Sequence, residues 1–219
     1  MSKVYDCSVE SELLAGMRLA RTSLGRGELV VLPTDTVYGI AADAFNPAAV
    51  QRLLDAKGRT RQQPPPVLVS GPDTLAALAA VVPEPVTRLV EAFWPGGLTV
   101  ILPAQPSLAW DLGETHDTVA LRMPDHDLTL ELLRDTGPLA VSSANRTGMP
   151  PATTSAEAYD MLGEAVEVYL DAGTGKSVPS TIVDATALTI EGGTARVLRD
   201  GAISREQLRE VLGDLLSED

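Results

Sequence analysis

A short apolar run followed directly by hydroxyl and acidic side chains constrains the fold of this chain more than any other feature. Residues 29–32 are apolar and include two valines, which is typical of a buried strand, and Pro33 ends the run. The residues up to Gly39 then include Thr34, Asp35, Thr36 and Tyr38. Open α/β sheets bind ligands outside the carboxyl ends of their strands. The segment therefore favours a strand with a ligand-facing end, and an ordinary polar turn is the alternative.

Several later segments also place basic or hydroxyl side chains, or a glycine turn that allows close backbone approach, beside predicted strands. They are residues 57–59 (Lys-Gly-Arg), 94–97 (Trp-Pro-Gly-Gly), 118–122 (Thr-Val-Ala-Leu-Arg), 142–145 (Ser-Ser-Ala-Asn), 179–181 (Pro-Ser-Thr) and 198–201 (Leu-Arg-Asp-Gly). Each segment alone could be a packed loop, a hydroxyl-rich turn or a surface ion pair. Because the pattern recurs, we expect these segments to surround a small polyanionic ligand, with a hydroxyl-lined pocket nearby.

Arg122 is the most informative basic residue. Strand alternation puts Thr118, Ala120 and Arg122 on one face of the strand predicted for residues 118–122. An arginine on the inward face of a buried strand needs a bound anion or a pairing acid, because an unpaired buried charge is very costly. The sequence leaves both possibilities open, and Asp125 is the candidate acid.

Helical and strand patterns alternate along the chain, which predicts one α/β domain over residues 1–219 with a twisted, open, mixed sheet and helices on its faces. Helices are expected at residues 9–24, 47–57, 73–81, 86–93, 127–134, 154–161 and 204–215. Strands are expected at residues 29–32, 67–69, 98–102, 118–122, 139–141, 166–170, 181–184, 188–190 and 195–198, with a Gly192-Gly193 turn joining the last two.

Capping signals mark several of these helix ends. Asn46 and Asp127 are expected N-caps, and Gly58 is expected to end its helix. Thr154 with Glu157, and Ser204 with Gln207, have the spacing of capping boxes.

Composition excludes several classes of protein. The net charge of −13 argues against stable nucleic-acid binding, because a strongly acidic protein repels phosphate backbones. The single cysteine, Cys7, forms no internal disulfide and is typical of a reducing cytoplasm, and two histidines argue against a soft-ligand metal site. No apolar run reaches the ~18 residues of a membrane span. We therefore expect a cytoplasmic protein.

The basic residues are nevertheless clustered. Arg52, Lys57, Arg59 and Arg61 lie within ten residues that contain one acid, Asp55. Such a cluster suits a small anionic ligand. Alternatively, cations at the carboxyl-terminal end of a helix are stabilised by the helix dipole.

Residues 173–177 (Gly-Thr-Gly-Lys-Ser) resemble the end of a phosphate-binding P-loop. The motif needs a glycine where this chain has Leu170, and it needs a following helix, which Pro179 opposes. We interpret the segment as a loop bordering the cavity.

The ordered set of motifs resembles the YrdC-type threonylcarbamoyl-AMP synthase family over about residues 12–205. The motifs are Pro-Thr-Asp-Thr-Val-Tyr-Gly, Lys-Gly-Arg, Trp-Pro-Gly-Gly-Leu-Thr, Val-Ala-Leu-Arg-Met-Pro, Ser-Ser-Ala-Asn-Arg-Thr-Gly and Pro-Ser-Thr-Ile-Val-Asp. The resemblance implies a twisted α/β sheet with a large cavity on one side, in the short, single-domain form. It also implies synthesis of threonylcarbamoyl-AMP and pyrophosphate from L-threonine, bicarbonate and ATP, for tRNA threonylcarbamoyl-adenosine modification.

The resemblance also implies roles for individual residues. The threonine site would comprise Thr36, Arg122, Val141 and Ser180, with Arg122 holding the carboxylate. The ATP site would comprise Lys57, Arg59, Gln63, Thr118, Ser143, Asn145 and Arg199, with Lys57 and Arg59 also catalytic. The chain departs from the family in having Gln63 for an asparagine, Ser142 for a proline, and a residue near Ser70 for a histidine.

The implied mechanism needs no covalent enzyme intermediate. The amine of threonine attacks CO₂ or bicarbonate, and an oxygen of the resulting carbamate attacks the α-phosphorus of ATP. The protein would contribute positioning and electrostatic stabilisation, Mg²⁺ would arrive with ATP, and no metal ligand in the chain is expected. The expected partner is a threonylcarbamoyl transferase complex. The alternatives are a carbamoyl-transfer relative and a nucleotide- or RNA-binding module without synthase activity.

Overall fold

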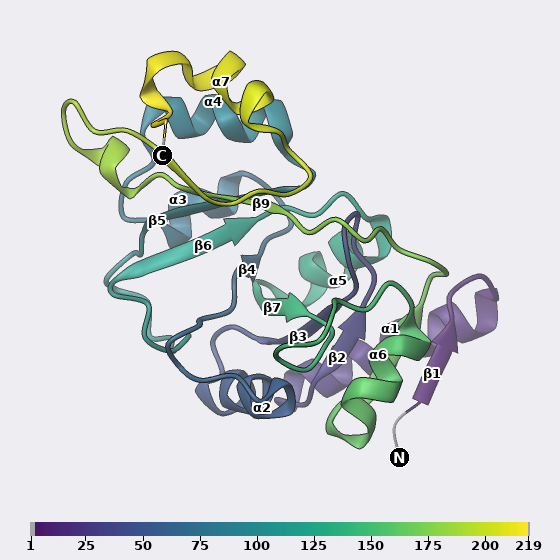
Figure 1. Ribbon diagram of the computed structural model, residues 1–219. Helices are drawn as coiled ribbons and strands as arrows, with labels where there is room; N and C mark the ends of the chain where they lie inside the picture. The colour runs from purple at the N-terminus through teal and green to yellow at the C-terminus, as the bar shows by residue number, and fades with distance from the viewer. Residues whose placement is uncertain (1–2, 219) are drawn as a thin grey trace.

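The computed structural model describes residues 3–218, which form one open ten-stranded sheet (Figure 1). The strands are β1 (Lys3–Asp6), β2 (Val30–Leu32), β3 (Gly39–Asp43), β4 (Val67–Leu68), β5 (Leu98–Pro103), β6 (Thr118–Arg122), β7 (Leu139–Ser143), β8 (Val168–Asp171), β9 (Thr181–Asp184) and β10 (Arg196–Arg199). Their order across the sheet is β1-β8-β2-β3-β7-β4-β6-β5-β9-β10.

The sheet is mixed, as predicted. Parallel pairs are β1/β8, β8/β2, β4/β6 and β5/β9, and the remaining neighbours are antiparallel. Strands distant in sequence become neighbours, for example β3 and β7, which pair Gly39 with Ser143. This topology brings the polar strand ends of the sequence together.

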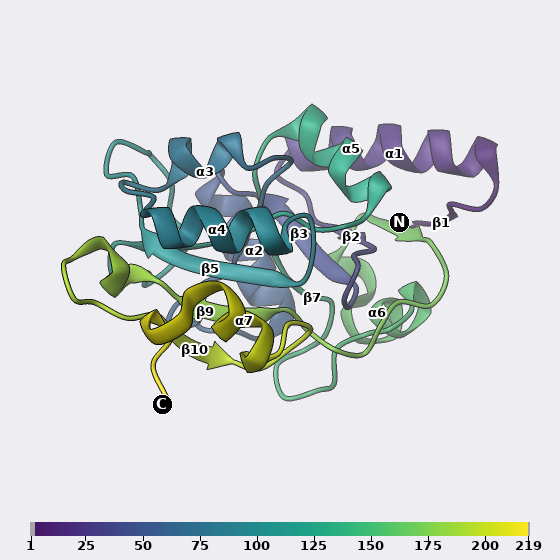
Figure 2. The same cartoon turned by 90° about the horizontal axis from the view of Figure 1, so that it is seen from above.

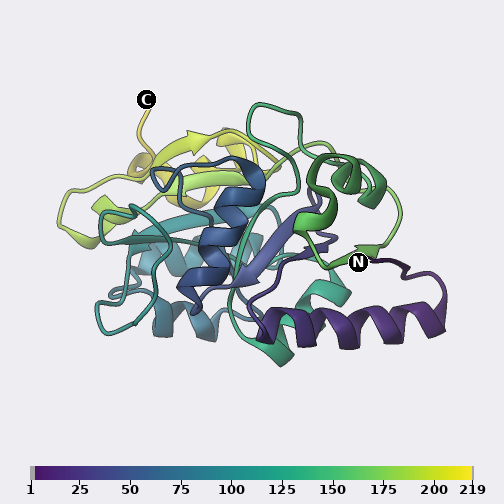
Figure 3. The same ribbon diagram turned by 90° about the horizontal axis from the view of Figure 1, so that it is seen from below.

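Helices cover the sheet. They are α1 (Glu10–Gly25), α2 (Pro47–Lys57), α3 (Asp73–Leu78), α4 (Glu84–Phe93), α5 (Asp127–Thr136), α6 (Ser155–Leu162) and α7 (Arg205–Leu212). Figure 2 shows α1 and α5 side by side, and Figure 3 shows α2 and α6 on the other side of the strands from α1. Strand β2 explains this sandwich: Val30 and Leu32 pack with the α1 side chains, whereas Val31 packs with those of α2 and α6.

In the other half of the sheet, helices cover only one face of strands β5 and β6. Val100 and Leu102 of β5 and Val119 and Leu121 of β6 join the core made with α3, α4 and α7. The alternate residues of the same strands face a cavity, among them Thr99, Ile101, Thr118, Ala120 and Arg122. The shared face predicted for residues 118, 120 and 122 is therefore confirmed.

Three capping predictions are confirmed. The Asn46 side chain accepts a hydrogen bond from the Ala49 backbone N–H, and Gly58 ends α2 in the left-handed conformation. Ser204 and Gln207 form a complete capping box on α7.

Two other capping predictions are corrected. Asp127 is the first residue of α5 rather than its cap, which is His126. Thr154 caps α6, but the Glu157 carboxylate accepts hydrogen bonds from the Thr153 backbone N–H and hydroxyl, so the capping box is not reciprocal.

The predicted strand at residues 188–190 is wrong. Thr186–Thr189 form a 3₁₀ turn, because the Asp184 carboxylate accepts hydrogen bonds from both the backbone N–H and the hydroxyl of Thr186. Strand β10 consequently pairs with β9 and not across the Gly192-Gly193 turn. Helix α3 ends at Leu78, earlier than the predicted residue 81, and β1 and β3 are additional to the predicted strands.

Within residues 3–218, no helix combines the length and apolar character that crossing a membrane requires.

Candidate active site

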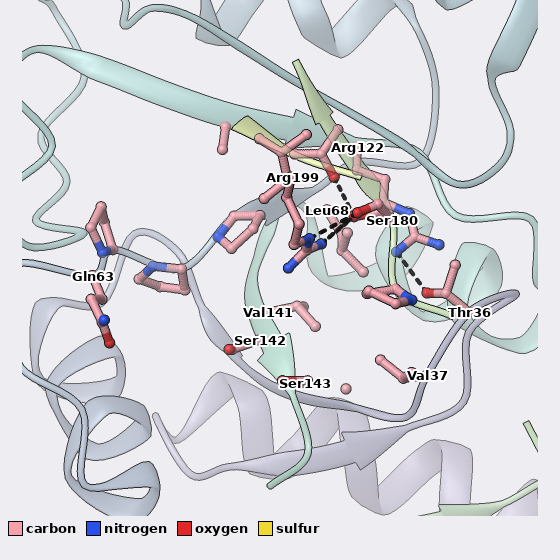
Figure 4. A pocket seen from close by; sticks show the side chains of 18 of the residues that line it. Thr36, Val37, Gln63, Leu68, Arg122, Val141, Ser142, Ser143, Ser180 and Arg199 are labelled. Atoms are coloured by element: carbon pink, nitrogen blue, oxygen red, sulfur yellow. Dashed lines mark hydrogen bonds between the residues drawn. The ribbon is translucent and has the colours of Figure 1, made fainter. Parts of the chain in front are cut away.

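A cavity of about 570 Å³ lies over the polar faces of β5, β6 and β9 (Figure 4). Its wall is completed by the turn after β2, the loop after α2, the end of β7 and the end of β10. Nine of the predicted site residues line it: Thr36, Arg59, Gln63, Thr118, Arg122, Val141, Ser143, Ser180 and Arg199. The sheet topology thus assembles segments that span more than 160 residues of sequence.

Arg122 is fixed by three contacts in the wall. Its Nε donates to the Gly96 carbonyl at 2.9 Å, Nη1 donates to Thr36 Oγ1 at 2.9 Å, and Nη2 donates to Asp35 Oδ1 at 2.6 Å. The alternative of a bridge to Asp125 is wrong, because the side-chain partner is Asp35 and Asp125 contributes only a backbone N–H to the same carboxylate. Since a guanidinium carries five N–H groups, two remain for a ligand.

Arg199 is held at the end of β10 by Ser180. Its Nε and Nη2 both donate to the Ser180 carbonyl, at 3.0 and 2.7 Å, and Nη2 also donates to Ser180 Oγ at 2.9 Å (Figure 4). The neighbouring Asp200 pairs with Arg205 instead. Arg199 therefore faces the cavity without an acid partner among the described residues.

Arg59 approaches the cavity from the loop after α2. Its Nη1 donates to Ser142 Oγ at 3.1 Å, while its Nε is buried and has no hydrogen-bond partner within the described part of the chain. Arg59 lines the cavity and makes no other hydrogen bond within residues 3–218, so its remaining terminal N–H groups can donate to a bound anion.

The cavity is electropositive. Burial, followed by the charges of Arg122 and Arg59, lowers the pKa of Arg199. Burial also lowers the pKa values of Arg59 and Arg122, the latter against the opposing effect of Asp35. No carboxylate is among the described residues that line the cavity. Three arginines with one acid between them create a strong preference for an anion.

Two predicted ATP residues lie behind the wall. Lys57 is 1% exposed, and its Nζ donates to the carbonyls of Ser143 and Asn145 and, at 3.4 Å, to Asn145 Oδ1. The Asn145 amide donates to the carbonyls of Arg146 and Met149. Burial, followed by the charge of Arg59, lowers the pKa of Lys57 to about 7. In this structure both side chains hold the turn after β7, and their contact with ATP stays a prediction.

The structure adds cavity residues that the sequence analysis did not single out. The apolar ones include Pro64, Pro65, Pro66, Leu68, Leu112 and Ile182. The three consecutive prolines were a usable signal, because such a run favours extended backbone over helix. Ser70 is outside the set of lining residues, whereas Leu68, two residues earlier, lies in the wall.

The P-loop-like segment, residues 173–177, is not among the residues that line this cavity. No helix follows it, as predicted, and the Lys176 backbone N–H donates to the Thr36 carbonyl. It lines a smaller second cavity with Asp35 and His126.

A metal-ligand cluster is also absent from residues 3–218: no three His, Cys, Asp or Glu side chains are grouped to hold an ion.

Comparison with known proteins agrees with this architecture. Residues 22–201 match the Sua5/YciO/YrdC family model, described as "Telomere recombination". The chain is 48% identical to a Mycobacterium tuberculosis protein over 97% of this chain and 96% of that one. It is 38% identical to the threonylcarbamoyl-AMP synthase of Bacillus subtilis, over 90% of this chain and 56% of that one.

Among solved structures, Pyrococcus abyssi Sua5 complexed with L-threonine superimposes with a TM-score of 0.86 at 31% identity. The match covers 99% of this chain and 62% of the P. abyssi chain. Family model, relatives and fold agree, and this chain belongs to the Sua5/YciO/YrdC family.

Proposed function

We propose that this protein is a threonylcarbamoyl-AMP synthase, which forms threonylcarbamoyl-AMP and pyrophosphate from L-threonine, bicarbonate and ATP. The observation that carries the proposal is the convergence of Arg59, Arg122 and Arg199 on one cavity of a chain from this family. Threonylcarbamoyl-AMP synthase is the printed name of the B. subtilis relative, and L-threonine is bound in the P. abyssi structure.

The amino-acid end of the cavity is assigned to Thr36, Arg122, Val141 and Ser180. Arg122 retains two N–H groups after its three wall contacts, and a planar guanidinium suits a carboxylate. Val141 and Leu68 add apolar surface beside it. This combination supports recognition of a small amino acid with an apolar group near its carboxylate.

The phosphate end is assigned to Arg59 and Arg199, with Thr118, Ser143 and Gln63 in the same wall. Neither arginine forms an ion pair within residues 3–218, where their hydrogen-bond partners are Ser142 and Ser180. The phosphates of ATP would supply the missing negative charge. The adjacent proline run offers an apolar wall, which suits the nucleoside part of ATP.

The chemistry requires charge stabilisation more than an enzyme nucleophile. The deprotonated threonine amine attacks bicarbonate with loss of water, or CO₂ with loss of a proton, to give a carbamate. A carbamate oxygen then attacks the α-phosphorus as pyrophosphate leaves. Arg59 and Arg199 would stabilise the charge that accumulates on the phosphates, and the cavity would hold the reactants in line.

Mg²⁺ is proposed only as a companion of ATP. The described lining has no carboxylate, and hydroxyls and guanidiniums do not form a protein-borne magnesium site. The ion would therefore enter bound to the phosphates. A threonylcarbamoyl transferase complex is the proposed recipient of the product, and the cytoplasm the proposed location.

The two alternative functions require different properties of the protein. An RNA-binding module would need a basic surface, whereas the net charge is −13. A carbamoyl-transfer relative would use ATP without requiring threonine.

The test is pyrophosphate release by purified protein supplied with ATP, Mg²⁺, bicarbonate and L-threonine. We expect release that stops when either threonine or bicarbonate is omitted. Release that continues without both would identify a plain ATPase and contradict the proposal.

A further inference from the structure

The hydroxyl hydrogen of Thr36 is used in a hydrogen bond to another side chain of the protein. Thr34 Oγ1 donates to the Val37 carbonyl at 2.7 Å, which uses the only hydrogen of that hydroxyl. Thr34 Oγ1 and Thr36 Oγ1 lie 3.1 Å apart, so Thr36 must be the donor of this pair. Thr36 Oγ1 also accepts from Arg122 Nη1, which leaves one lone pair. Toward the cavity, Thr36 is therefore an acceptor.

The hydroxyl of Ser180 has the opposite hydrogen-bonding role toward the cavity. Thr99 is 0% exposed, and its hydroxyl has one partner among residues 3–218, Ser180 Oγ at 2.8 Å. If Ser180 donated, the buried Thr99 hydrogen would have no acceptor, which costs free energy, so Thr99 donates. Ser180 Oγ also accepts from Arg199 Nη2. With both lone pairs occupied, Ser180 can only donate to a ligand.

We propose that Thr34 and Thr99 are positioning residues that make Thr36 an acceptor and Ser180 a donor, and so fix the orientation of the amino-acid substrate. Figure 4 shows Thr36 and Ser180 on either side of the Arg122 guanidinium. This inference rests on the proposed function, because it assigns which substrate group meets which hydroxyl.

The substrate offers one matching arrangement. A carboxylate only accepts hydrogen bonds, so it belongs beside Ser180 and the free N–H groups of Arg122. The α-amino group offers only N–H donors, both as the ammonium ion of free threonine and as the amine that keeps its lone pair for attack, so it belongs beside Thr36. The threonine hydroxyl can donate or accept and therefore does not need either preset partner.

The test measures how much the affinity of each variant depends on the amino group and on the carboxylate of the ligand. Dissociation constants would be obtained by ligand-observed NMR for L-threonine, for 3-hydroxybutyrate, which lacks the amino group, and for L-threoninamide, which lacks the carboxylate. The variants are Thr34→Val and Thr99→Val, with Thr34→Ser and Thr99→Ser as controls that keep the hydroxyl.

We expect a crossed pattern. Thr34→Val should weaken L-threonine binding about tenfold but 3-hydroxybutyrate binding less than about threefold, since a hydrogen bond to a charged group contributes more than a neutral one. Thr99→Val should weaken L-threonine about tenfold but L-threoninamide less than about threefold. Both serine variants should bind like the wild type.

Other results would overturn the proposal. Unchanged threonine affinity in the valine variants, or equal losses for all three ligands, would mean that the two threonines do not orient the substrate. If Thr34→Val fails to fold, Thr36→Val must show the same selective loss. A wild-type protein that does not bind L-threonine would instead contradict the proposed function.

Discussion

The Arg122 guanidinium lies against the Asp35 carboxylate, with Nη2 2.6 Å from Oδ1 and side chains only 8% and 12% exposed. Asp35 Oδ1 also accepts from the Asp125 backbone N–H at 3.0 Å. One carboxylate thus joins the turn after β2, the end of β6 and the segment before α5. The buried pair fixes the direction in which Arg122 faces the cavity.

Replacing Arg122 tests its role in amino-acid binding. Arg122→Leu should weaken L-threonine binding roughly 30- to 1000-fold, because a lost charged partner costs on the order of 2–4 kcal/mol, while affinity for a nonhydrolysable ATP analogue changes little. Calorimetric titration of both ligands provides the comparison, with Arg88→Leu, on the exposed face of α4, as the control. Unchanged threonine affinity in a folded variant would remove Arg122 from the amino-acid site.

The ion pair between Asp35 and Arg122 should also stabilise the folded protein. Asp35→Ala leaves the buried Arg122 charge uncompensated and should lower the free energy of unfolding by about 3–5 kcal/mol. The double variant Asp35→Ala/Arg122→Leu should lose less than the sum of the two single variants, because neither charge is left alone. Urea denaturation measures this cycle, and strictly additive losses would show that the two side chains are not coupled.

Arg59 tests the phosphate end. Arg59→Ala should weaken ATP binding and nearly abolish turnover, because Arg59 lines the cavity without an acid partner among the described residues and would donate charge-assisted hydrogen bonds to the phosphates. Arg26→Ala, just beyond α1, is the matched control and should leave both unchanged. Full turnover by a folded Arg59→Ala protein would exclude this arginine from the site.

Lys57 should make stability depend on pH. Burial lowers its pKa from 10.5 to about 7 in the folded protein, so between these values the unfolded chain binds more protons. The free energy of unfolding should therefore rise with pH over this window, by at most about 1.4 kcal/mol per pH unit, relative to Lys57→Met. Urea denaturation at pH 7 and pH 9, with exposed Lys3→Met as control, measures the difference. A pH-independent difference would mean that Lys57 stays charged when folded.

Local patterns in the sequence predicted much of the fold. Asn46, Gly58 and the Ser204–Gln207 box mark helix ends through contacts within a few residues, and all three were confirmed. Strand β3 was missed because its small residues, Gly39 to Asp43, have weak strand character by themselves. They pair because β2 and β7 flank them, and a side chain at Gly39 would collide with Val141 Cγ1 at 2.6 Å.

The sequence predicted which residues line the cavity better than it predicted which residues contact one another. Strand alternation correctly placed Thr118 and Arg122 on the cavity face. Asp125 was the candidate acid for Arg122 because it is a neighbour in sequence, whereas the acid found in the structure, Asp35, is 87 residues away. For the same reason, the sequence could not indicate that Lys57 turns inward to Ser143 and Asn145, which requires the position of β7 relative to α2.

The carbon of bicarbonate can be followed to test whether this protein makes threonylcarbamoyl-AMP. Purified protein would be incubated with ¹⁴C-bicarbonate, ³H-threonine, ATP and Mg²⁺, and the nucleotides separated rapidly by chromatography. The account predicts one adenylate that carries both labels in equal amounts and forms together with an equal amount of pyrophosphate. ATP breakdown without a doubly labelled adenylate would contradict it.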